Sequence, residues 1–384
     1  MQLEFRGLPA GRSNNRYMRI EELPTPCLVL DKRVLERNLA RMSSRIHSLG
    51  VHLRPHLKTA KSAVIARIAT RGEAGGITVS TLAEAEYFAG HGFRDILVAA
   101  ALSPQKLDRA ARLVDRGIDV SLITDDLDGA RAIATHRAHF NVLIELDSGD
   151  HRAGIHADSD HLPEIARVLG VKFAGVMTHA GHSYGCRDIA CIREVAGVER
   201  ATVVNAARRL RESGIECRVV SVGSTPTMTH ADSLEGVTEA RPGVYMFQDL
   251  YQAEIGSCTL DDIAVTVLAS VIGKNETENR FLIDAGALAL SKDRSTQSAP
   301  RDFGYGAVWD IDCKPVFGNC FVERVWQEHG LAVSDEKLDF RALTVGTRVR
   351  VGPNHACITA AAHDRYYVVE AGEVVAEWDR INGW

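Results

Sequence analysis

The 384-residue sequence predicts an α/β protein made of a TIM-like (β/α)8 barrel and a second, mainly antiparallel β domain. Between about residues 50 and 250, short β-branched runs alternate with longer amphipathic segments, the pattern of parallel strands joined by crossover helices. After about residue 255, helical periodicity nearly disappears and strand-like runs follow one another. An open doubly wound sheet is the alternative, but the units are regular and no Gly-x-Gly-x-x-Gly turn follows the first strand.

Eight strands are expected in the first part of the chain. They are Val51–Pro55, Gly76–Ser80, Asp95–Ala99, Asp119–Ile123, Asn141–Asp147, Phe173–His179, Arg218–Gly223 and Gly243–Phe247. The intervening segments Leu82–Gly92, Gln105–Arg116 and Ile192–Ser213 place apolar residues three and four positions apart, as the buried face of a helix requires. Eight such units in about 200 residues fit a compact barrel.

The last third of the chain predicts an antiparallel β domain. Its expected strands are Ile263–Ile272, Arg280–Asp284, Cys320–Gln327, Leu343–Val351 and Tyr366–Glu370. A strand at Pro26–Asp31 can join this domain before the helix Lys32–Leu49 leads into the barrel. We therefore assign residues 25–252 to the barrel domain, and residues 1–24 with 253–384 to the β domain.

Composition excludes several classes of partner. The net charge of -5 offers no basic face for a phosphate backbone, so nucleic acid is not an expected partner. No segment approaches the roughly 20 apolar residues of a membrane helix, and Met1–Ile20 is too charged for a secretory signal, so a cytoplasmic protein is expected. Eight scattered cysteines without a Cys-x-x-Cys pair are too few for a disulfide framework and are expected to be mostly buried thiols.

Polar residues gather where the barrel strands end, which is where such barrels place their active sites. Lys58 and Lys61 follow the first strand, Arg152 follows the fifth, and His179 ends the sixth. Small and hydroxyl residues end and follow the seventh strand (Gly223, Ser224, Thr225) and lie in the eighth (Gly243, Tyr245), the part of such barrels that commonly holds a phosphate. Singly, each has an ordinary explanation, such as a surface lysine, a salt-bridge arginine or a polar loop. Together, a lysine and a phosphate-type loop favour a phosphorylated cofactor held at both ends.

Several segments carry a resemblance to a known family. They are Thr25-Pro26-Cys27-Leu28-Val29-Leu30-Asp31, Arg54-Pro55-His56-Leu57-Lys58-Thr59, Arg241-Pro242-Gly243-Val244-Tyr245, Asp284-Ala285-Gly286, Gln327-Glu328-His329-Gly330 and Pro353-Asn354-His355-Ala356-Cys357. Over nearly its whole length the chain resembles the fold-type III pyridoxal-phosphate (PLP) enzymes, the alanine-racemase-like group. Within that group it is similar to the D-serine dehydratase and D-threonine aldolase branch. The Arg-Pro-His-x-Lys-Thr segment is specific after a first barrel strand, whereas Pro-Gly-x-Tyr alone is weak.

The resemblance implies roles for the residues at the strand ends. Lys58 would hold PLP as a Schiff base and also take the Cα proton of the substrate. Arg152 would approach the phenolic oxygen of the cofactor. The remaining residues would handle the phosphate (Ser224, Thr225, Gly243, Tyr245) or border the cofactor (His179, Tyr184).

The segment His355-Ala356-Cys357 is a candidate metal site in the β domain. In a strand, residues i and i+2 project from one face, so His355 and Cys357 can reach one ion. A His-x-Cys pair alone is weak, since zinc usually takes at least three ligands and the pair can be a buried histidine beside an inert thiol. By the resemblance, metal-dependent members carry a histidine and a second ligand here, and Cys357 in place of the aspartate of the aldolases indicates Zn²⁺ and the D-serine dehydratases.

These observations predict a PLP- and zinc-dependent dehydratase that eliminates the β-hydroxyl of a D-3-hydroxy amino acid, with D-serine, D-threonine and D-threo-3-hydroxyaspartate as candidate substrates. A metal-dependent D-threonine or 3-hydroxy-D-aspartate aldolase is the main alternative. An amino-acid racemase would need a second base, for which Tyr305 is a candidate, and would leave the His-x-Cys pair unexplained. A non-catalytic PLP carrier would resemble a bare barrel. The resemblance also implies a homodimer in which each β domain closes the partner's barrel mouth.

Overall fold

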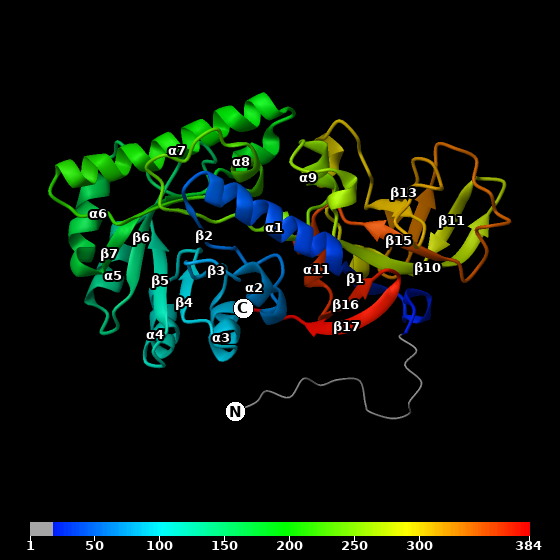
Figure 1. Cartoon of the computed structure of the whole chain (residues 1–384), viewed down its shortest axis with the longest axis horizontal. Coiled ribbons are helices and arrows are strands. Elements are labelled where there is room, and N and C mark those ends of the chain that lie inside the picture. The colour runs from blue at the N-terminus through cyan, green and yellow to red at the C-terminus, as the bar shows by residue number, and fades with distance from the viewer. Residues whose placement is uncertain (1–17) are drawn as a thin grey trace.

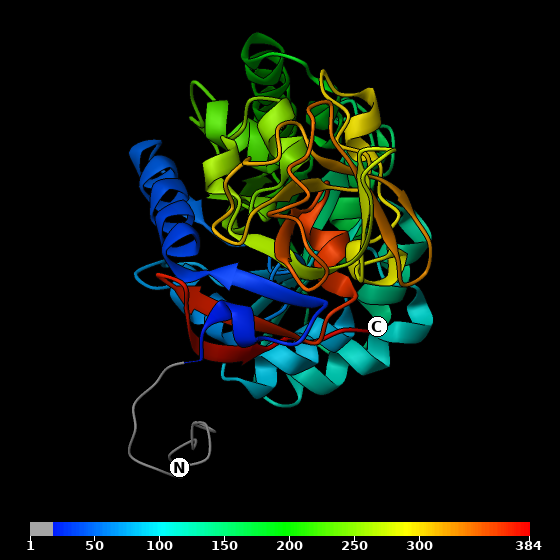
Figure 2. The ribbon, with the colours of Figure 1, turned by 90° about the vertical axis from the view of Figure 1, so that its right-hand side faces the viewer.

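The computed structural model describes residues 18–384 as two bodies joined by the long helix α1 (Lys32–Ser48), as Figure 1 shows. The expectation that no signal sequence is present, and most of the segment 1–24 assigned to the β domain, fall on residues 1–17, outside the described residues. Viewed from the side of the β domain, this domain lies in front of the barrel helices (Figure 2). Within residues 18–384, no helix is long and apolar enough to cross a membrane.

The first body is a curled sheet of eight parallel strands in the order β2-β9-β8-β7-β6-β5-β4-β3. The strands are β2 (His52–Leu53), β3 (Ile77–Val79), β4 (Asp95–Val98), β5 (Asp119–Thr124), β6 (Asn141–Leu146), β7 (Phe173–Thr178), β8 (Val219–Val222) and β9 (Glu239–Ala240). The two ends of the sheet meet just after β2, where Leu57 N–H donates to Thr78 O over 2.8 Å and Thr78 N–H donates to Pro55 O over 2.9 Å. This closure confirms the predicted TIM-like barrel.

Seven of the eight expected strands overlap strands of the structure, but the eighth prediction is wrong. Gly243–Phe247 is not a strand, since Val244–Met246 forms a 3-10 helix, and the last barrel strand is the short β9 that precedes it. All three residues of the 3-10 helix are buried. A turn buried on every side has the same continuous apolar composition as a core strand, so periodicity does not separate the two.

Helices follow the barrel strands in regular alternation. They are α2 (Ala63–Ala69), α3 (Leu82–Gly90), α4 (Leu107–Val114), α5 (Leu127–Thr135), α6 (His161–Leu169), α7 (Ile189–Glu212), α8 (Thr225–His230) and α9 (Leu250–Glu254). In α4, Leu107, Ala110 and Ala111 are buried at helical spacing, which is the periodicity that predicted this helix. The start of α7 is fixed by Asp188, whose side chain accepts the Cys191 N–H.

The second body is a nine-stranded, mainly antiparallel sheet in the order β11-β14-β13-β12-β15-β10-β1-β16-β17, with β10 also pairing β11. Its strands are β1 (Cys27–Asp31), β10 (Val265–Asn275), β11 (Arg280–Ile283), β12 (Ala307–Trp309), β13 (Phe321–Val325), β14 (Gly330–Val333), β15 (Arg348–Gly352), β16 (Arg365–Glu370) and β17 (Glu373–Asp379). Two short helices, α10 (Ala287–Leu290) and α11 (Ala356–Ala361), interrupt it. The N-terminal strand does join this sheet, between β10 and β16. The strands β12, β14 and β17 escaped prediction because they are very short or, in β17, mostly exposed at the sheet edge.

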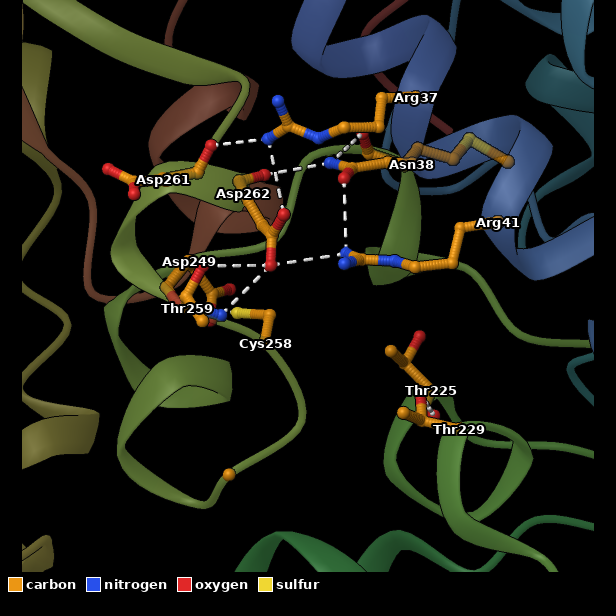
Figure 3. Close-up of polar contacts among 12 residues, drawn as sticks. Arg37, Asn38, Arg41, Thr225, Thr229, Asp249, Cys258, Thr259, Asp261 and Asp262 are labelled. Carbon is orange, nitrogen blue, oxygen red and sulfur yellow. Dashed lines mark hydrogen bonds and ion pairs between the residues drawn. The ribbon is translucent and has the colours of Figure 1, made fainter.

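Helix α1 is tied by polar contacts to the segment that leads from the barrel into the second body (Figure 3). Arg37 and Arg41 each lie 3.2 Å from the carboxylate of Asp262. The amide of Asn38 donates to Asp262 O over 2.7 Å and to Met246 O over 3.3 Å. Asp262 and Asn38 are buried, so these contacts fix the barrel and the β domain to the same helix.

The cysteines follow the sequence expectation only in part. Cys27, Cys217 and Cys320 are buried thiols, as expected. Cys186 and Cys191, however, form a disulfide that the sequence did not predict. They meet because the turn after β7 leads directly into α7 and brings their Cα atoms within 5.6 Å.

Candidate active site

A cavity of about 460 Å³ lies where the C-terminal ends of the barrel strands meet the second body. Its walls come from loops that follow β2, β6, β7, β8 and β9, from α9, and from the β-domain residues Ser295, His355 and Cys357. The lining residues are His56, Lys58, Thr59, Asp150, Arg152, His179, Gly181, Tyr184, Ser224, Thr225, Arg241, Gly243, Val244, Asp249, Tyr251, Gln252, Ser295, His355 and Cys357. The barrel and the β domain therefore build one site together.

The structure brings the predicted site residues together with one exception. Lys58, Arg152, His179, Tyr184, Ser224, Thr225, Gly243, His355 and Cys357 all line the cavity. Tyr245 does not: its side chain is 1% exposed and belongs to the hydrophobic core. Only its backbone contributes, because the Tyr245 N–H donates to Thr225 Oγ1 over 3.0 Å. The apolar 3-10 helix points this tyrosine inward, away from the cavity.

Two lysines follow the first barrel strand, and their surroundings differ. The ammonium of Lys61 lies 3.2 Å from the carboxylate of the buried Glu84. Lys58 is an exposed residue that faces the cavity, and it forms no ion pair within residues 18–384. Lys58 is therefore the lysine available for chemistry.

Nitrogen-bearing side chains line one part of the cavity around Lys58. His179 Nδ1 lies 2.6 Å from Gly223 O, so this nitrogen carries the proton and Nε2 is an acceptor. Burial, followed by the charge of Lys58, lowers the pKa of His179 to about 3, and the imidazole is neutral at physiological pH. The buried Arg241 donates from Nε to Ser221 Oγ over 2.6 Å and from Nη2 to Thr178 O over 2.5 Å. This concentration of positive charge favours an anionic ligand.

Arg241 is a cavity residue to which the sequence analysis gave no role. The signal was present, because Arg241 directly follows the strand β9, at the same barrel end as the other site residues. For Arg152, the ordinary explanation of a salt-bridge arginine holds in part. Its side chain is 60% exposed and lies 3.7 Å from the Glu145 carboxylate, a loose ion pair that leaves the guanidinium free to meet a ligand.

The loops after β8 and β9 form a narrow hydroxyl-lined corner. Ser224 caps α8, and its Oγ lies 2.8 Å from Thr227 Oγ1 and 3.1 Å from Ser183 Oγ. A Cβ on Gly243 would lie 2.9 Å from His56 O, so only glycine lets these two backbone segments approach so closely. This corner combines hydroxyl groups with a backbone that a small ligand group can approach.

The pair His355 and Cys357 does not lie in a strand, contrary to the sequence prediction. His355 is the extended residue before α11, and Cys357 lies in the first turn of that helix. The two side chains nevertheless share the cavity wall. Burial favours the neutral thiol, but the hydrogen bond and the charge of His355 outweigh it and lower the pKa of Cys357. Cys357 Sγ also lies 3.2 Å from the hydroxyl of Thr59, the residue after Lys58.

Other potential metal-binding side chains lie close to this pair. Asp293 Oδ2 is 3.9 Å from His355 Nδ1, and the buried Asp249 also lines the cavity. Across residues 18–384, however, no three histidine, cysteine, aspartate or glutamate side chains are grouped as a metal site. His355 and Cys357 are therefore a pair of potential metal ligands without a third such side chain grouped with them in the described residues.

Glu199 lies behind the cavity and joins two of its loops. This fully buried residue of α7 accepts the Ala180 N–H and the Gly223 N–H, each over 3.1 Å. Because Gly223 O accepts from His179, one carboxylate supports both the loop after β7 and the loop after β8. Burial raises the pKa of Glu199, although these N–H donors oppose that effect.

Comparison with known proteins places the chain in a family. The alanine racemase N-terminal domain matches residues 30–250, and the serine dehydratase domain matches residues 264–369. The D-threo-3-hydroxyaspartate dehydratase of Delftia sp. (strain HT23) is 43% identical over 94% of this chain and 98% of its own. The D-serine dehydratase of Dictyostelium discoideum is 31% identical over 91% of this chain and 94% of its own.

Solved structures agree with these sequence matches. The structure of the Delftia dehydratase has a TM-score of 0.92 at 42% identity and covers 95% of this chain and 100% of its own. A cysteine-to-alanine variant of D-threo-3-hydroxyaspartate dehydratase, solved in a metal-free form, has a TM-score of 0.93 at 41% identity and covers 96% of this chain and 100% of its own. The chain therefore belongs to the fold-type III PLP enzymes, in the group that joins an alanine racemase N-terminal domain to a serine dehydratase domain, and it is an enzyme of the PLP-dependent lyase type.

Proposed function

We propose that this enzyme is a PLP- and zinc-dependent dehydratase, which converts a D-3-hydroxy amino acid to a 2-oxo acid and ammonia by eliminating the β-hydroxyl. One observation carries the proposal. The His355–Cys357 pair shares a cavity with Lys58, and the hydroxyl of Thr59 links the thiol to the lysine segment over 3.2 Å. A base for the Cα proton and a pair of ligands for a Lewis acid are thus available to the same small substrate.

The cavity fits PLP. Its volume of about 460 Å³ lies within the usual range for small-molecule sites, roughly 300 to 1,000 Å³. The backbone approach at Gly243 and the neighbouring hydroxyls fit a phosphate group. Lys58, which has no ion-pair partner among residues 18–384, fits a Schiff-base lysine. In addition, the buried Gln252 lines the cavity with an Oε1 atom that has no hydrogen-bond partner in the described structure, as expected if a ligand completes the site.

We assign the cofactor contacts accordingly. Lys58 would form the Schiff base, and Arg152 would approach the phenolic oxygen. The hydroxyls of Ser224 and Thr225 and the backbone at Gly243 would hold the phosphate, with His179 and Tyr184 bordering the ring. Tyr245 would contribute through its backbone contact with Thr225 alone.

The donors at the cavity wall fit zinc. Imidazole and thiolate are ligands that Zn²⁺ prefers, and the contact with His355 favours the thiolate form of Cys357. With two protein ligands, such an ion would remain open to water or to a substrate oxygen. The solved metal-free form of a related dehydratase cysteine variant supports a metal in this group.

The residues of this chain then divide the work of elimination. PLP, when bound, supplies an electron sink for the charge left at Cα. Lys58 Nζ is placed to take the Cα proton, while His355 and Cys357 would hold a Zn²⁺ ion, which would supply Lewis acidity at the β-oxygen. The neutral His179 keeps its proton on Nδ1, where it donates to Gly223 O, and thereby holds its ring in one orientation. The β domain contributes Ser295, His355 and Cys357 to the wall of the cavity.

The test is product analysis with D-threo-3-hydroxyaspartate, D-serine and D-threonine, with and without added Zn²⁺. We expect ammonia and a 2-oxo acid in zinc-dependent amounts, and from D-threonine specifically 2-oxobutanoate. Glycine and acetaldehyde from D-threonine would instead show the aldolase. The first substrate is the natural starting point because the 43% identical relative is a D-threo-3-hydroxyaspartate dehydratase.

The racemase alternative would leave the His355–Cys357 pair of the cavity without a role. Its candidate second base, Tyr305, does not line the cavity of its own chain, and its ring lies 5.1 Å from the guanidinium of Arg294. The family resemblance supports two further proposals, a homodimer and a cytoplasmic location. Size-exclusion chromatography with light scattering checks the first, and cell fractionation checks the second.

Glu199 offers a prediction about the cofactor site. Both N–H groups donate to the same oxygen, Oε1, so Glu199→Leu leaves two buried donors without an acceptor. Such a loss costs about 1 to 3 kcal/mol, and we expect PLP to bind roughly tenfold more weakly. Titration of the apoenzyme with PLP measures this. Glu194→Leu, at an exposed position of the same helix, is the control, and equal PLP affinity in both variants would contradict the prediction.

A further inference from the structure

The turn that carries His355 and Cys357 needs an external support. In a strand, the pleat alone would direct both side chains to one face. Here the pair spans the junction between an extended residue and the helix α11, so the peptide group of Ala356 sets how the imidazole and the thiol lie relative to each other. That peptide N–H donates to Asp249 Oδ2 over 3.0 Å.

The carboxylate of Asp249 is already used in hydrogen bonds that hold this turn, which leaves it poorly suited to bind an ion. Its side chain is 2% exposed, and its second oxygen accepts the Gln252 N–H over 2.9 Å at the start of α9. Both carboxylate oxygens therefore already accept a backbone N–H. The contact also crosses from the last barrel segment to the β domain.

The backbone next to Asp249 extends the same connection. Leu250 N–H donates to Pro353 O over 3.0 Å, and Tyr251 N–H donates to Asn354 O over 3.3 Å. The residues directly before His355 are thus paired with the start of α9. Asp249 closes this ladder at the His355–Ala356 peptide, one of the two peptide groups that link His355 to Cys357.

We propose that Asp249 is the positioning residue of the zinc-binding pair: its carboxylate fixes the Ala356 peptide so that His355 and Cys357 face one ion. The inference rests on the proposed zinc-dependent function. It differs from that function in giving a role to a residue that is not a ligand. Supporting groups behind metal ligands commonly change metal affinity by about 10- to 100-fold.

Asp262 provides a matched control. It is also a buried aspartate, and Figure 3 shows it in the same part of the molecule as Asp249. Its carboxylate, however, faces Arg37 and Arg41 of α1 and the Thr259 N–H. Asp262→Asn removes a charge from a buried carboxylate of this region without touching the turn that holds Cys357.

The experiment measures Zn²⁺ binding to the PLP-loaded enzyme. Wild type, Asp249→Asn and Asp262→Asn are stripped with a chelator and titrated with Zn²⁺ against a chromophoric competitor. Co²⁺ substitution then reports thiolate ligation through its charge-transfer band. We expect Asp249→Asn to bind Zn²⁺ about 10- to 100-fold more weakly and to weaken the cobalt band, with unchanged PLP absorbance. Asp262→Asn should stay within about threefold of wild type.

A second variant removes the same contact from the other side. Ala356→Pro has no N–H to donate, and proline is accepted at the first position of a helix, which Ala356 occupies. We expect the same loss of Zn²⁺ affinity, and no further loss in the double variant with Asp249→Asn. If wild type binds Zn²⁺ and both single variants bind it equally well, the role of Asp249 is wrong and the zinc function stands. If wild type binds no Zn²⁺, the zinc function fails and this inference with it.

Discussion

Lys58→Ala is expected to abolish the absorption band of lysine-bound PLP and to lower kcat/KM by about 10⁴-fold, the upper end of what one positioned acid–base group contributes. The effect is large because one amine both tethers the cofactor and takes the Cα proton. Lys58 faces the cavity, and no described side chain of opposite charge forms an ion pair with it. Absorption spectra and steady-state kinetics of the purified variant measure the two effects.

Lys61→Ala is the control for this experiment, since it removes a lysine from the same loop. Lys61 is paired with Glu84, so its loss leaves a buried carboxylate without its cation and should lower stability. The absorption band of bound PLP should nevertheless remain. If Lys58→Ala keeps the band and Lys61→Ala loses it, the assignment of the two lysines is reversed.

The barrel could be predicted because its signals are local. A run of β-branched residues predicts each strand, and apolar residues three and four positions apart predict each helix. Leu107, Ala110 and Ala111 in α4 are an example of the helical spacing. The same rule failed at Val244–Met246, where a buried turn has the composition of a strand. It failed again at His355 and Cys357, whose short spacing suits a strand face but which lie at a helix start.

The site residues likewise differ in whether a local sequence pattern predicts them. Lys58, His179 and Ser224 could be found because each follows a barrel strand in sequence. The supporting residues could not be found this way. Glu199 reaches two loops from the middle of α7, and Asp249 accepts the N–H of Ala356 from a distant part of the chain. Such contacts form only when the whole chain is folded, so no local sequence pattern predicts them.

Removal of the metal should stop elimination without disturbing the bound cofactor. The ligand pair His355 and Cys357 lies on the β-domain side of the cavity, whereas Lys58 and the hydroxyl corner belong to the barrel. A Lewis acid contributes several kcal/mol, and about 1.4 kcal/mol corresponds to tenfold in rate, so a loss of about 10³-fold in kcat is expected. Treatment with a chelator, followed by activity assays and PLP absorption spectra, measures both properties on the same sample.

The variants His355→Ala and Cys357→Ala should reproduce the effect of the chelator, and added Zn²⁺ should restore activity to the chelated wild type but not to them. Cys217→Ala, which removes a buried thiol of the barrel, is the matched control and should keep both zinc dependence and activity. A chelated enzyme that retains full dehydratase activity would show that hydroxide leaves without a metal. The cavity would then have to supply a proton to the β-hydroxyl from its own side chains, and the Thr59 hydroxyl beside Cys357 would be the first group to replace.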